Sequence, residues 1–192
     1  MTRTGRGRRA LVASLAVGAA AAVLVAVLAT RSTPPGSEVA TRLGGQLAPP
    51  IAGRTLVGDR QVSLASMRGK YVLVDFFASW CVPCQQEVPQ IEAFLFQHRR
   101  GRDVAALGVD IDENAADGRA FLERVGATWP AVEDPSGARS FALAYSVADP
   151  PESYLVAPDG RVVAEIAGGV TTASLDRLLA DARAAATAAA GT

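Results

Sequence analysis

The chain has 192 residues, 49% of them hydrophobic, and its formal charges sum to zero. This length allows one domain with a sizeable core and short appendages. The charge is unevenly distributed, because residues 46–192 carry 13 basic and 18 acidic side chains. A nucleic-acid partner is therefore excluded, since binding to nucleic acid requires a basic surface.

Residues 1–30 have the pattern of a targeting segment. A basic start precedes the apolar run Ala10–Ala29, which is interrupted only by Ser14 and Gly18. As a helix this run is roughly 30 Å long, which matches the hydrocarbon thickness of a bilayer. We therefore predict an uncleaved signal anchor, with the basic flank in the cytoplasm and the rest of the chain exported. The alternative is a signal peptide removed near Ala29, which would make the protein secreted. The basic residues are Arg3, Arg6, Arg8 and Arg9.

The next segment, residues 31–45, is predicted to be a linker. It is rich in Pro, Gly and Ser and has few large apolar side chains. We place a single domain at residues 46–183. An Ala-rich tail at residues 184–192 is expected to fray from the last helix.

Apolar runs and turn residues predict the elements of this domain. Leu56–Val57 and Gln61–Leu64 flank Gly58-Asp59, which predicts a short hairpin. The continuous apolar run Tyr71–Phe77 predicts a strand buried on both faces, and residues 81–99 predict a helix. This order of elements predicts an α/β fold with a mixed central sheet flanked by helices on both faces. The remaining predicted elements are a strand at Val104–Val109, a helix at Asn114–Val125, an extended piece at Trp129–Val132, a helix at Ser136–Tyr145, a hairpin of Ser153–Ala157 with Arg161–Ala167, and a helix at Thr172–Ala182.

The chain contains two cysteines, Cys81 and Cys84, in the sequence Trp-Cys-Val-Pro-Cys. This CxxC pair stands between the predicted strand at residues 71–77 and the predicted helix at residues 81–99. A helix N-terminus stabilises a thiolate through its unpaired N–H groups and its dipole. The position therefore favours thiol–disulfide exchange, with Cys81 as the exposed nucleophile and Cys84 as the resolving thiol.

Three other interpretations of the pair are weaker. A structural disulfide that closes so short a loop would contribute only about 2 kcal/mol to stability. A zinc site needs four ligands, and the chain has one histidine, His98, and no second CxxC. A peroxidatic cysteine is usually preceded by Pro and Thr, where this chain has Asp75 and Ala78. No metal or other cofactor is therefore predicted.

Two sets of acidic residues invite a functional interpretation. Asp75 lies inside the apolar run 71–77, so burial is expected to raise its pKa. A buried carboxylate at this place can accept the proton of Cys84 during exchange; the alternative is a merely hydrogen-bonded buried Asp. Asp110, Asp112 and Glu113 lie close together in sequence, and we interpret them as solvated loop acids rather than a cation site.

The chain resembles the thioredoxin fold, and specifically the membrane-anchored TlpA/ResA/DsbE-like thiol–disulfide oxidoreductases. The resemblance covers about residues 43–183 and implies a thioredoxin fold with an N-terminal β-hairpin and a helical insert. The activity that it implies is that of a protein-disulfide oxidoreductase without a cofactor. The matching stretches are Ala48-Pro49, Leu64–Lys70, Val74–Cys84, Glu87–Pro89, Trp129-Pro130, Pro151–Tyr154 and Pro158–Gly160.

The resemblance also implies roles for residues around the two cysteines. Trp80 would pack beside them as a lid, or be an ordinary core tryptophan, and Pro83 would help set the redox poise. Pro151 resembles the cis-proline that faces the CxxC in this fold. Pro150 departs from the family pattern, because a proline before the cis-proline has no N–H to offer a substrate backbone.

Two glutamates complete the predicted site. Glu152 and Glu87 match acids near the active site of the cytochrome c maturation branch. Each would contact the substrate or tune a cysteine pKa, or else be an ordinary surface acid. The site residues predicted from the sequence are Cys81 and Cys84 as the redox-active pair, Asp75 as proton acceptor, and Trp80, Pro83, Pro151 and Glu152 at the substrate.

These observations predict an exported, membrane-tethered oxidoreductase at the cell membrane, with a single span and an extracytoplasmic catalytic domain. By resemblance, it keeps cysteines of apocytochrome c or a similar exported protein reduced, with electrons from a membrane donor. One alternative is a general extracytoplasmic oxidant that forms disulfides. Another is a copper-delivery module of the Sco type, which is disfavoured because that class has CxxxC and a distant His.

Overall fold

The computed structural model describes residues 37–39 and 43–191. The predicted membrane anchor at residues 10–29 lies outside the described residues. Within these two ranges, no helix combines the length and the apolar character needed to cross a membrane.

The strands and helices follow the predicted order closely. The strands are β1 Ser37–Val39, β2 Ala52–Arg54, β3 Gln61–Ser63, β4 Tyr71–Phe77, β5 Val104–Asp110, β6 Ala131–Glu133, β7 Glu152–Val156 and β8 Val162–Ala167. The α-helices are α2 Val82–His98, α3 Ala115–Val125, α4 Phe141–Tyr145 and α5 Thr172–Ala190, with 3-10 turns η1 Leu64–Met67 and η2 Gly137–Arg139.

A mixed sheet of six strands forms the centre, in the order β1-β8-β7-β4-β5-β6. The strands β4, β5 and β6 run parallel, whereas β7 is antiparallel to β4 and β8 is antiparallel to β7. All seven residues of β4 are buried, because this central strand is covered on both faces. The sheet thus confirms the fold class that the sequence predicts.

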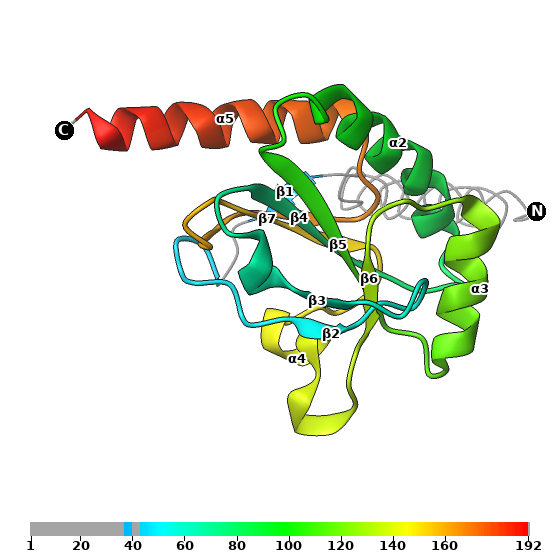
Figure 1. The fold of residues 1–192 in the computed structure, drawn as a ribbon. Helices are drawn as coiled ribbons and strands as arrows, with labels where there is room; N and C mark the ends of the chain where they lie inside the picture. Colours follow the sequence, from blue (N-terminus) through cyan, green and yellow to red (C-terminus); the bar gives the residue numbers. More distant parts are fainter. Residues whose placement is uncertain (1–36, 40–42, 192) are drawn as a thin grey trace, which may run out of the picture. The chain divides into compact units, whose positions relative to one another are not determined.

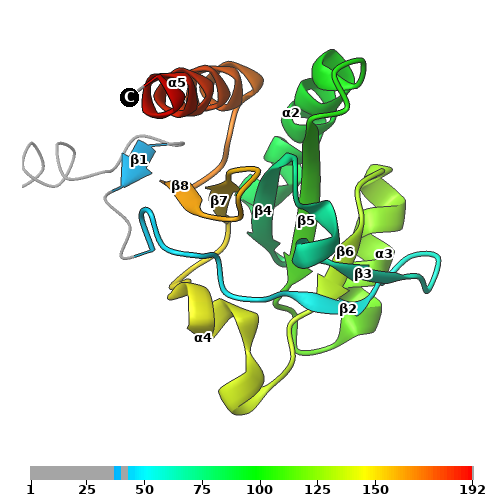
Figure 2. The same cartoon turned by 60° about the vertical axis from the view of Figure 1, so that its left-hand side comes forward.

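Two hydrophobic clusters occupy the two faces of this sheet. On one face, side chains of β4 pack with α2, α3 and α5, for example Leu73 with Ile91 and Leu175 in the same cluster. On the other face, Phe76 belongs to a cluster with η1, α4 and the segment before β2. Figure 1 shows α2 and α5 on one side of the sheet, with α4 and the β2–β3 hairpin on the other, and Figure 2 shows the hairpin beside β5 and β6.

The N-terminal hairpin exists, but its first strand starts earlier than predicted. Strand β2 pairs with β3 from Ala52 opposite Ser63. The predicted strand residue Leu56 is instead buried in the hydrophobic core. The turn begins at Thr55, whose hydroxyl donates to the Val57 carbonyl at 2.7 Å and accepts from the Arg60 N–H at 3.0 Å. Burial of one leucine and these side-chain bonds therefore override the strand pattern.

The predicted helix at residues 136–145 is divided into η2 and α4. Ser140 interrupts it, because its ψ of 128° is not helical. Asp134 stabilises the new start: its carboxylate accepts from the Ser140 hydroxyl at 2.7 Å and from the Ala142 N–H at 3.3 Å. Ser140 caps α4 with its own hydroxyl, which accepts from the Leu143 N–H at 3.1 Å, and Asp134 from outside the segment completes this cap.

Two further boundaries differ from the prediction. Strand β1 lies inside the predicted linker and pairs with β8, from Ser37 opposite Ala167 to Val39 opposite Glu165. At the other end, α5 continues through the predicted tail as far as Ala190. Alanine has the highest helix propensity, so the Ala-rich composition extends the helix rather than fraying it.

Candidate functional site

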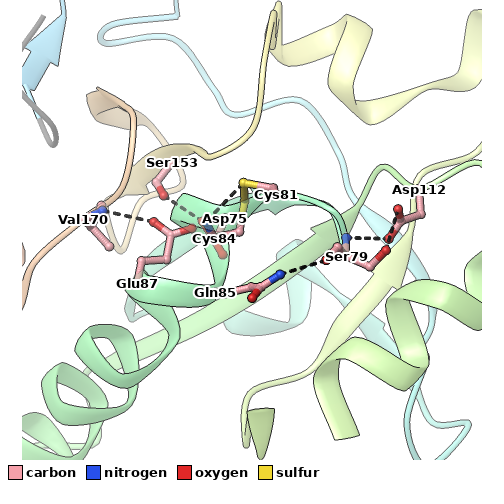
Figure 3. Close-up of a disulfide and its surroundings, with 9 residues drawn as sticks. All are labelled: Asp75, Ser79, Cys81, Cys84, Gln85, Glu87, Asp112, Ser153 and Val170. Carbon is pink, nitrogen blue, oxygen red and sulfur yellow. Dashed lines mark hydrogen bonds between the residues drawn. A yellow bond between two sulfur atoms is a disulfide. The ribbon is translucent and has the colours of Figure 1, made fainter. Parts of the chain in front are cut away.

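The two cysteines lie where the central strand β4 leads into α2. Cys81 is the N-cap of the helix, and the Cys84 backbone N–H points at the Cys81 Sγ, 3.1 Å away. The two sulfurs form a disulfide with an S–S distance of 2.05 Å, drawn in Figure 3. On reduction, the same N–H group and the helix dipole are placed to stabilise a Cys81 thiolate. The predicted strand–CxxC–helix arrangement is therefore present.

The exposure of these residues differs from the prediction. In this oxidised state Cys81 is only 3% exposed and Cys84 1%, because both belong to the hydrophobic cluster beneath α2. The prediction of an exposed Cys81 is therefore wrong for the disulfide form. The apolar surface beside the pair comes from its neighbours: Trp80 is 65% exposed and Val82 is exposed as well. Trp80 is thus no core tryptophan, and only a minor part of its surface packs against the protein.

Asp75 is buried in the middle of β4, as the sequence predicts. Its Oδ1 accepts a hydrogen bond of 2.9 Å from the Ser153 hydroxyl, which β7 places directly opposite. Burial raises the pKa of Asp75 to about 6, and the bond from Ser153 opposes this rise only in part. The carboxyl group can therefore change protonation near neutral pH, which a proton acceptor for Cys84 requires.

Glu87, one helical turn after Cys84, is a buried acid on the same side of the sheet. Its Oε2 accepts from the Val170 N–H at 3.0 Å, whereas Oε1 has no hydrogen-bond partner among the described residues. Burial, reinforced by the charge of Asp75, raises the pKa of Glu87 to about 10. Figure 3 shows the Glu87 carboxyl group directed toward Asp75, close to the disulfide. The interpretation of Glu87 as an ordinary surface acid is therefore wrong.

Together the two carboxyl groups form a buried pair that holds one proton at neutral pH. Glu87 keeps its proton there because its pKa is about 10, and Asp75 is largely ionised because its pKa is about 6. Two neighbouring carboxyl groups in an apolar site cannot both be ionised without a large energetic penalty, because their negative charges repel. The pair can accept a single further proton, which matches the one proton that Cys84 must lose.

The proline predicted to be cis is cis: the Pro150–Pro151 peptide bond has this form. Glu152, the next residue, is opposite Phe76 in the β4–β7 register. Pro151 therefore lies beside the end of β4 that leads to Cys81. Both residues of this dipeptide are prolines, so neither offers an N–H group there.

The structure separates Glu152 from the cysteines. It extends from the face of the sheet opposite Asp75, since neighbouring residues of a strand point to opposite faces. Its Oε1 accepts from the Tyr154 hydroxyl and its Oε2 from the Ala148 N–H. A role in substrate binding stays a prediction for Glu152, and the same holds for Pro83, which is exposed in the first turn of α2.

Other residues at the site were missed or misjudged. Asp112 is not a solvated loop acid: its carboxylate accepts from the N–H and hydroxyl of Ser79, two residues before Cys81. Asp110 is fully buried. The described residues include no group of three or more His, Cys, Asp or Glu side chains that could hold a metal ion. Of these acids, Asp112 therefore contacts the loop that leads to Cys81, whereas Glu113 is exposed.

Comparison with known proteins agrees with this geometry. The family model described as AhpC/TSA matches residues 45–165. The chain is similar to thiol-disulfide oxidoreductase ResA of Geobacillus kaustophilus, with 31% identity over 70% of this chain and 75% of the relative. It is 30% identical to ResA of Bacillus subtilis over 58% of this chain, which spans 61% of that relative.

Solved structures lead to the same group. A putative thiol:disulfide interchange protein DsbE from Chlorobium tepidum superposes with a TM-score of 0.65 and 27% identity, over 72% of this chain and 96% of that chain. The CxxC at the start of α2 and the cis-proline before β7 both lie within residues 45–165, which the family model matches. The chain therefore belongs to the AhpC/TSA family with a thioredoxin fold and, within it, to the TlpA/ResA/DsbE-like thiol–disulfide oxidoreductases.

Proposed function

We propose that this protein is an exported, membrane-tethered reductant that keeps cysteines of apocytochrome c, or of a similar exported protein, in the thiol form. The observation that carries the proposal is the CxxC pair above two buried carboxyl groups, Asp75 and Glu87. Export and tethering are supported by the sequence of residues 1–30, with its basic start and long apolar run.

The chemistry follows from the order of the two cysteines. In the reduced protein, the Cys81 thiolate attacks one sulfur of a substrate disulfide and releases the other as a thiolate. Cys84 then loses its proton to Asp75 and attacks the Cys81 Sγ. This second step forms the Cys81–Cys84 disulfide and releases the second substrate thiolate, which takes up a proton. Two electrons pass from the protein to the substrate.

The buried acids favour the reducing direction. A CxxC is strongly oxidising when its reduced form is stabilised, chiefly through a thiolate. Negative charge on Asp75 disfavours a nearby thiolate. The reduced form is therefore less stabilised than it would be in an apolar setting alone. This lowers the reduction potential, and a membrane protein that carries electrons from the cytoplasm would then restore the thiols.

The decisive experiment is to measure the reduction potential of the full-length chain against glutathione buffers. We expect a value nearer −270 mV than −120 mV, the two ends of the range of about 150 mV for thioredoxin-like proteins. Thiol trapping in cells should find the pair mostly reduced, and deletion should lower holocytochrome c without harming general disulfide formation. A potential above about −180 mV with a mostly oxidised pool would instead identify an oxidant.

A further inference from the structure

Ser79, in the loop between β4 and Cys81, is held by hydrogen bonds with two side chains. On one side the Asp112 carboxylate accepts two hydrogen bonds, from the Ser79 N–H at 2.8 Å and from its hydroxyl at 3.0 Å. On the other side the Gln85 side chain donates to the Ser79 carbonyl at 3.3 Å. Figure 3 shows Ser79 between these two side chains. All the polar groups of Ser79 are thus bound within the protein.

Asp112 is itself fixed to the core. Its N–H donates to Oδ1 of Asp110 at 3.2 Å, and Asp110 is fully buried at the end of β5, opposite Phe77 of β4. The second oxygen of Asp110 has no hydrogen-bond partner among the described residues and faces Gly118 of α3. A Cβ atom at Gly118 would lie 1.8 Å from that oxygen, so only glycine leaves room for the carboxyl group. Ser79 is therefore connected through Asp112 to Asp110, which is buried between the end of β5 and α3.

We propose that Asp112 is a positioning residue for the nucleophile Cys81, and that it acts through Ser79. The chain from Ala78 to Cys81 is closed by a bond of 3.1 Å from the Cys81 N–H to the Ala78 carbonyl. Once the disulfide is reduced, this turn and the N-cap are what hold Cys81 in place. Asp112 fixes the turn and so keeps the Cys81 sulfur within reach of the Cys84 N–H.

The direction in which the pKa of Cys81 changes when Asp112 is removed distinguishes positioning from a direct effect of charge. A carboxylate that acts by its charge raises the pKa of a nearby thiol, so its removal would lower the pKa of Cys81. A carboxylate that acts by position has the opposite effect. Without it, the Cys84 N–H reaches the thiolate for a smaller fraction of time, and the pKa of Cys81 rises toward its free value of about 8.5. Asp75 and Glu87 are the same in both cases, whereas Asp110, whose pKa burial and contacts with Asp112 raise to about 8, changes its surroundings when Asp112 is removed.

The test is the rate of Cys81 alkylation by iodoacetamide as a function of pH, followed by peptide mass in the reduced full-length chain. Asp112→Ala should raise the midpoint and slow alkylation at pH 7 by about three- to tenfold. Ser79→Ala keeps the backbone N–H and should slow it less. Glu113→Ala is the matched control, since it removes the same charge from an exposed position of the same loop.

The double variant of Asp112→Ala with Ser79→Ala completes the test. Because the Ser79 hydroxyl acts only through Asp112, the double variant should be no slower than Asp112→Ala alone. Additive effects, an unchanged midpoint or a lowered one would overturn the proposal. Should Asp112→Ala not fold, Asp112→Asn retains an acceptor oxygen and should give the same sign with a smaller change. Alkylation needs no physiological partner, so the outcome is independent of the direction of electron flow proposed above.

Discussion

Two buried glutamates, one on each face of the sheet, show how differently the same side chain can be used. Glu152 has a partner for each oxygen, the Tyr154 hydroxyl and the Ala148 N–H. Glu87 has the Val170 N–H for one oxygen and nothing among the described residues for the other, and it also faces the charge of Asp75. Burial raises the pKa of both, and a neighbouring acid adds to the rise in each case, Asp75 for Glu87 and Glu165 for Glu152; the pKa of Glu87 is raised to about 10.

The difference teaches how to distinguish a structural acid from a chemical one. A buried polar group is normally satisfied, and an unsatisfied one reduces stability by about 1–3 kcal/mol. Glu152 follows the rule, so its bonds stabilise the fold on the side of α4. Glu87 violates it beside the redox pair. A protein retains such a violation where it serves a reaction, and the predictions below test whether the two acids differ in this way.

The largest effects should come from substituting the two cysteines. The redox reaction takes place at these residues, on the same face of the sheet as Glu87. Cys81→Ser should abolish the reduction of insulin disulfides, because the nucleophile is lost. Cys84→Ser should instead accumulate mixed disulfides with substrates, since nothing resolves them. Non-reducing electrophoresis distinguishes the two. Traps formed by Cys81→Ser and not by Cys84→Ser would reverse the assigned roles.

Glu87→Gln should change the dependence of stability on pH. The raised pKa of Glu87 means that its stabilising contribution is complete below pH about 4.5 and is lost as the pH rises through about 10. The variant cannot ionise, so it should be more stable than the wild type by on the order of 3 kcal/mol at pH 8. Urea unfolding across this pH range measures the difference.

Glu152→Gln is the control for that experiment, because its amide oxygen can still accept from Tyr154 and it loses only the long bond of 3.3 Å from the Ala148 N–H. We expect its stability to stay within about 1 kcal/mol of the wild type at every pH. If the stability of Glu87→Gln and of Glu152→Gln changed with pH in the same way, the proposed difference between the two glutamates would be wrong.

Asp75→Asn should have two effects of opposite sign. The pKa of Asp75 is raised to about 6, so its contribution to stability is lost as the pH rises from about 4 through 6. Above pH 6 the variant should be more stable by on the order of 2 kcal/mol. Exchange should nevertheless be slower near neutral pH, and the defect should shrink at high pH, where Cys84 ionises unaided. A rate loss that is constant with pH would contradict proton transfer to Asp75.

Among the variants expected to change the molecule, the smallest effect should come from Tyr154→Phe on the structural face. The single O–H of Tyr154 is shared between the Glu152 carboxylate and the Tyr145 carbonyl, so its loss should lower stability by about 1–2 kcal/mol. Insulin reduction should be unchanged, because these groups lie on the face away from Cys81. A reduced exchange rate at full stability would show that both faces serve the reaction.

Much of the site could be predicted because its signals are local in sequence. An apolar run followed by CxxC fixes a buried strand, a turn and a helix N-terminus, and an acid within that run must be buried. Pro151 was predicted from a pattern of four adjacent residues. These predictions need no knowledge of which segments meet in space.

The parts that were left open or predicted wrongly depend on distant contacts. Glu87 lies on a helix, and whether its side chain is buried depends on the loop at Val170, 83 residues away. Asp112 reaches Ser79 only because β5 pairs with β4 in one register. Leu56 is buried in the core instead of forming the predicted strand, and Ser140 interrupts a predicted helix at the point where it binds Asp134. Periodicity and propensity cannot supply such pairings, since each is fixed by the assembled sheet.

Gly118 carries a consequence for engineering. It lies inside α3, where glycine is usually the first residue to replace, since alanine stabilises a helix interior by about 1 kcal/mol. Here a single added methyl group would meet the buried carboxyl of Asp110 and, through Asp112 and Ser79, disturb the turn before Cys81. A design guided by helix propensity alone would choose that change, so libraries in this helix should keep Gly118 fixed.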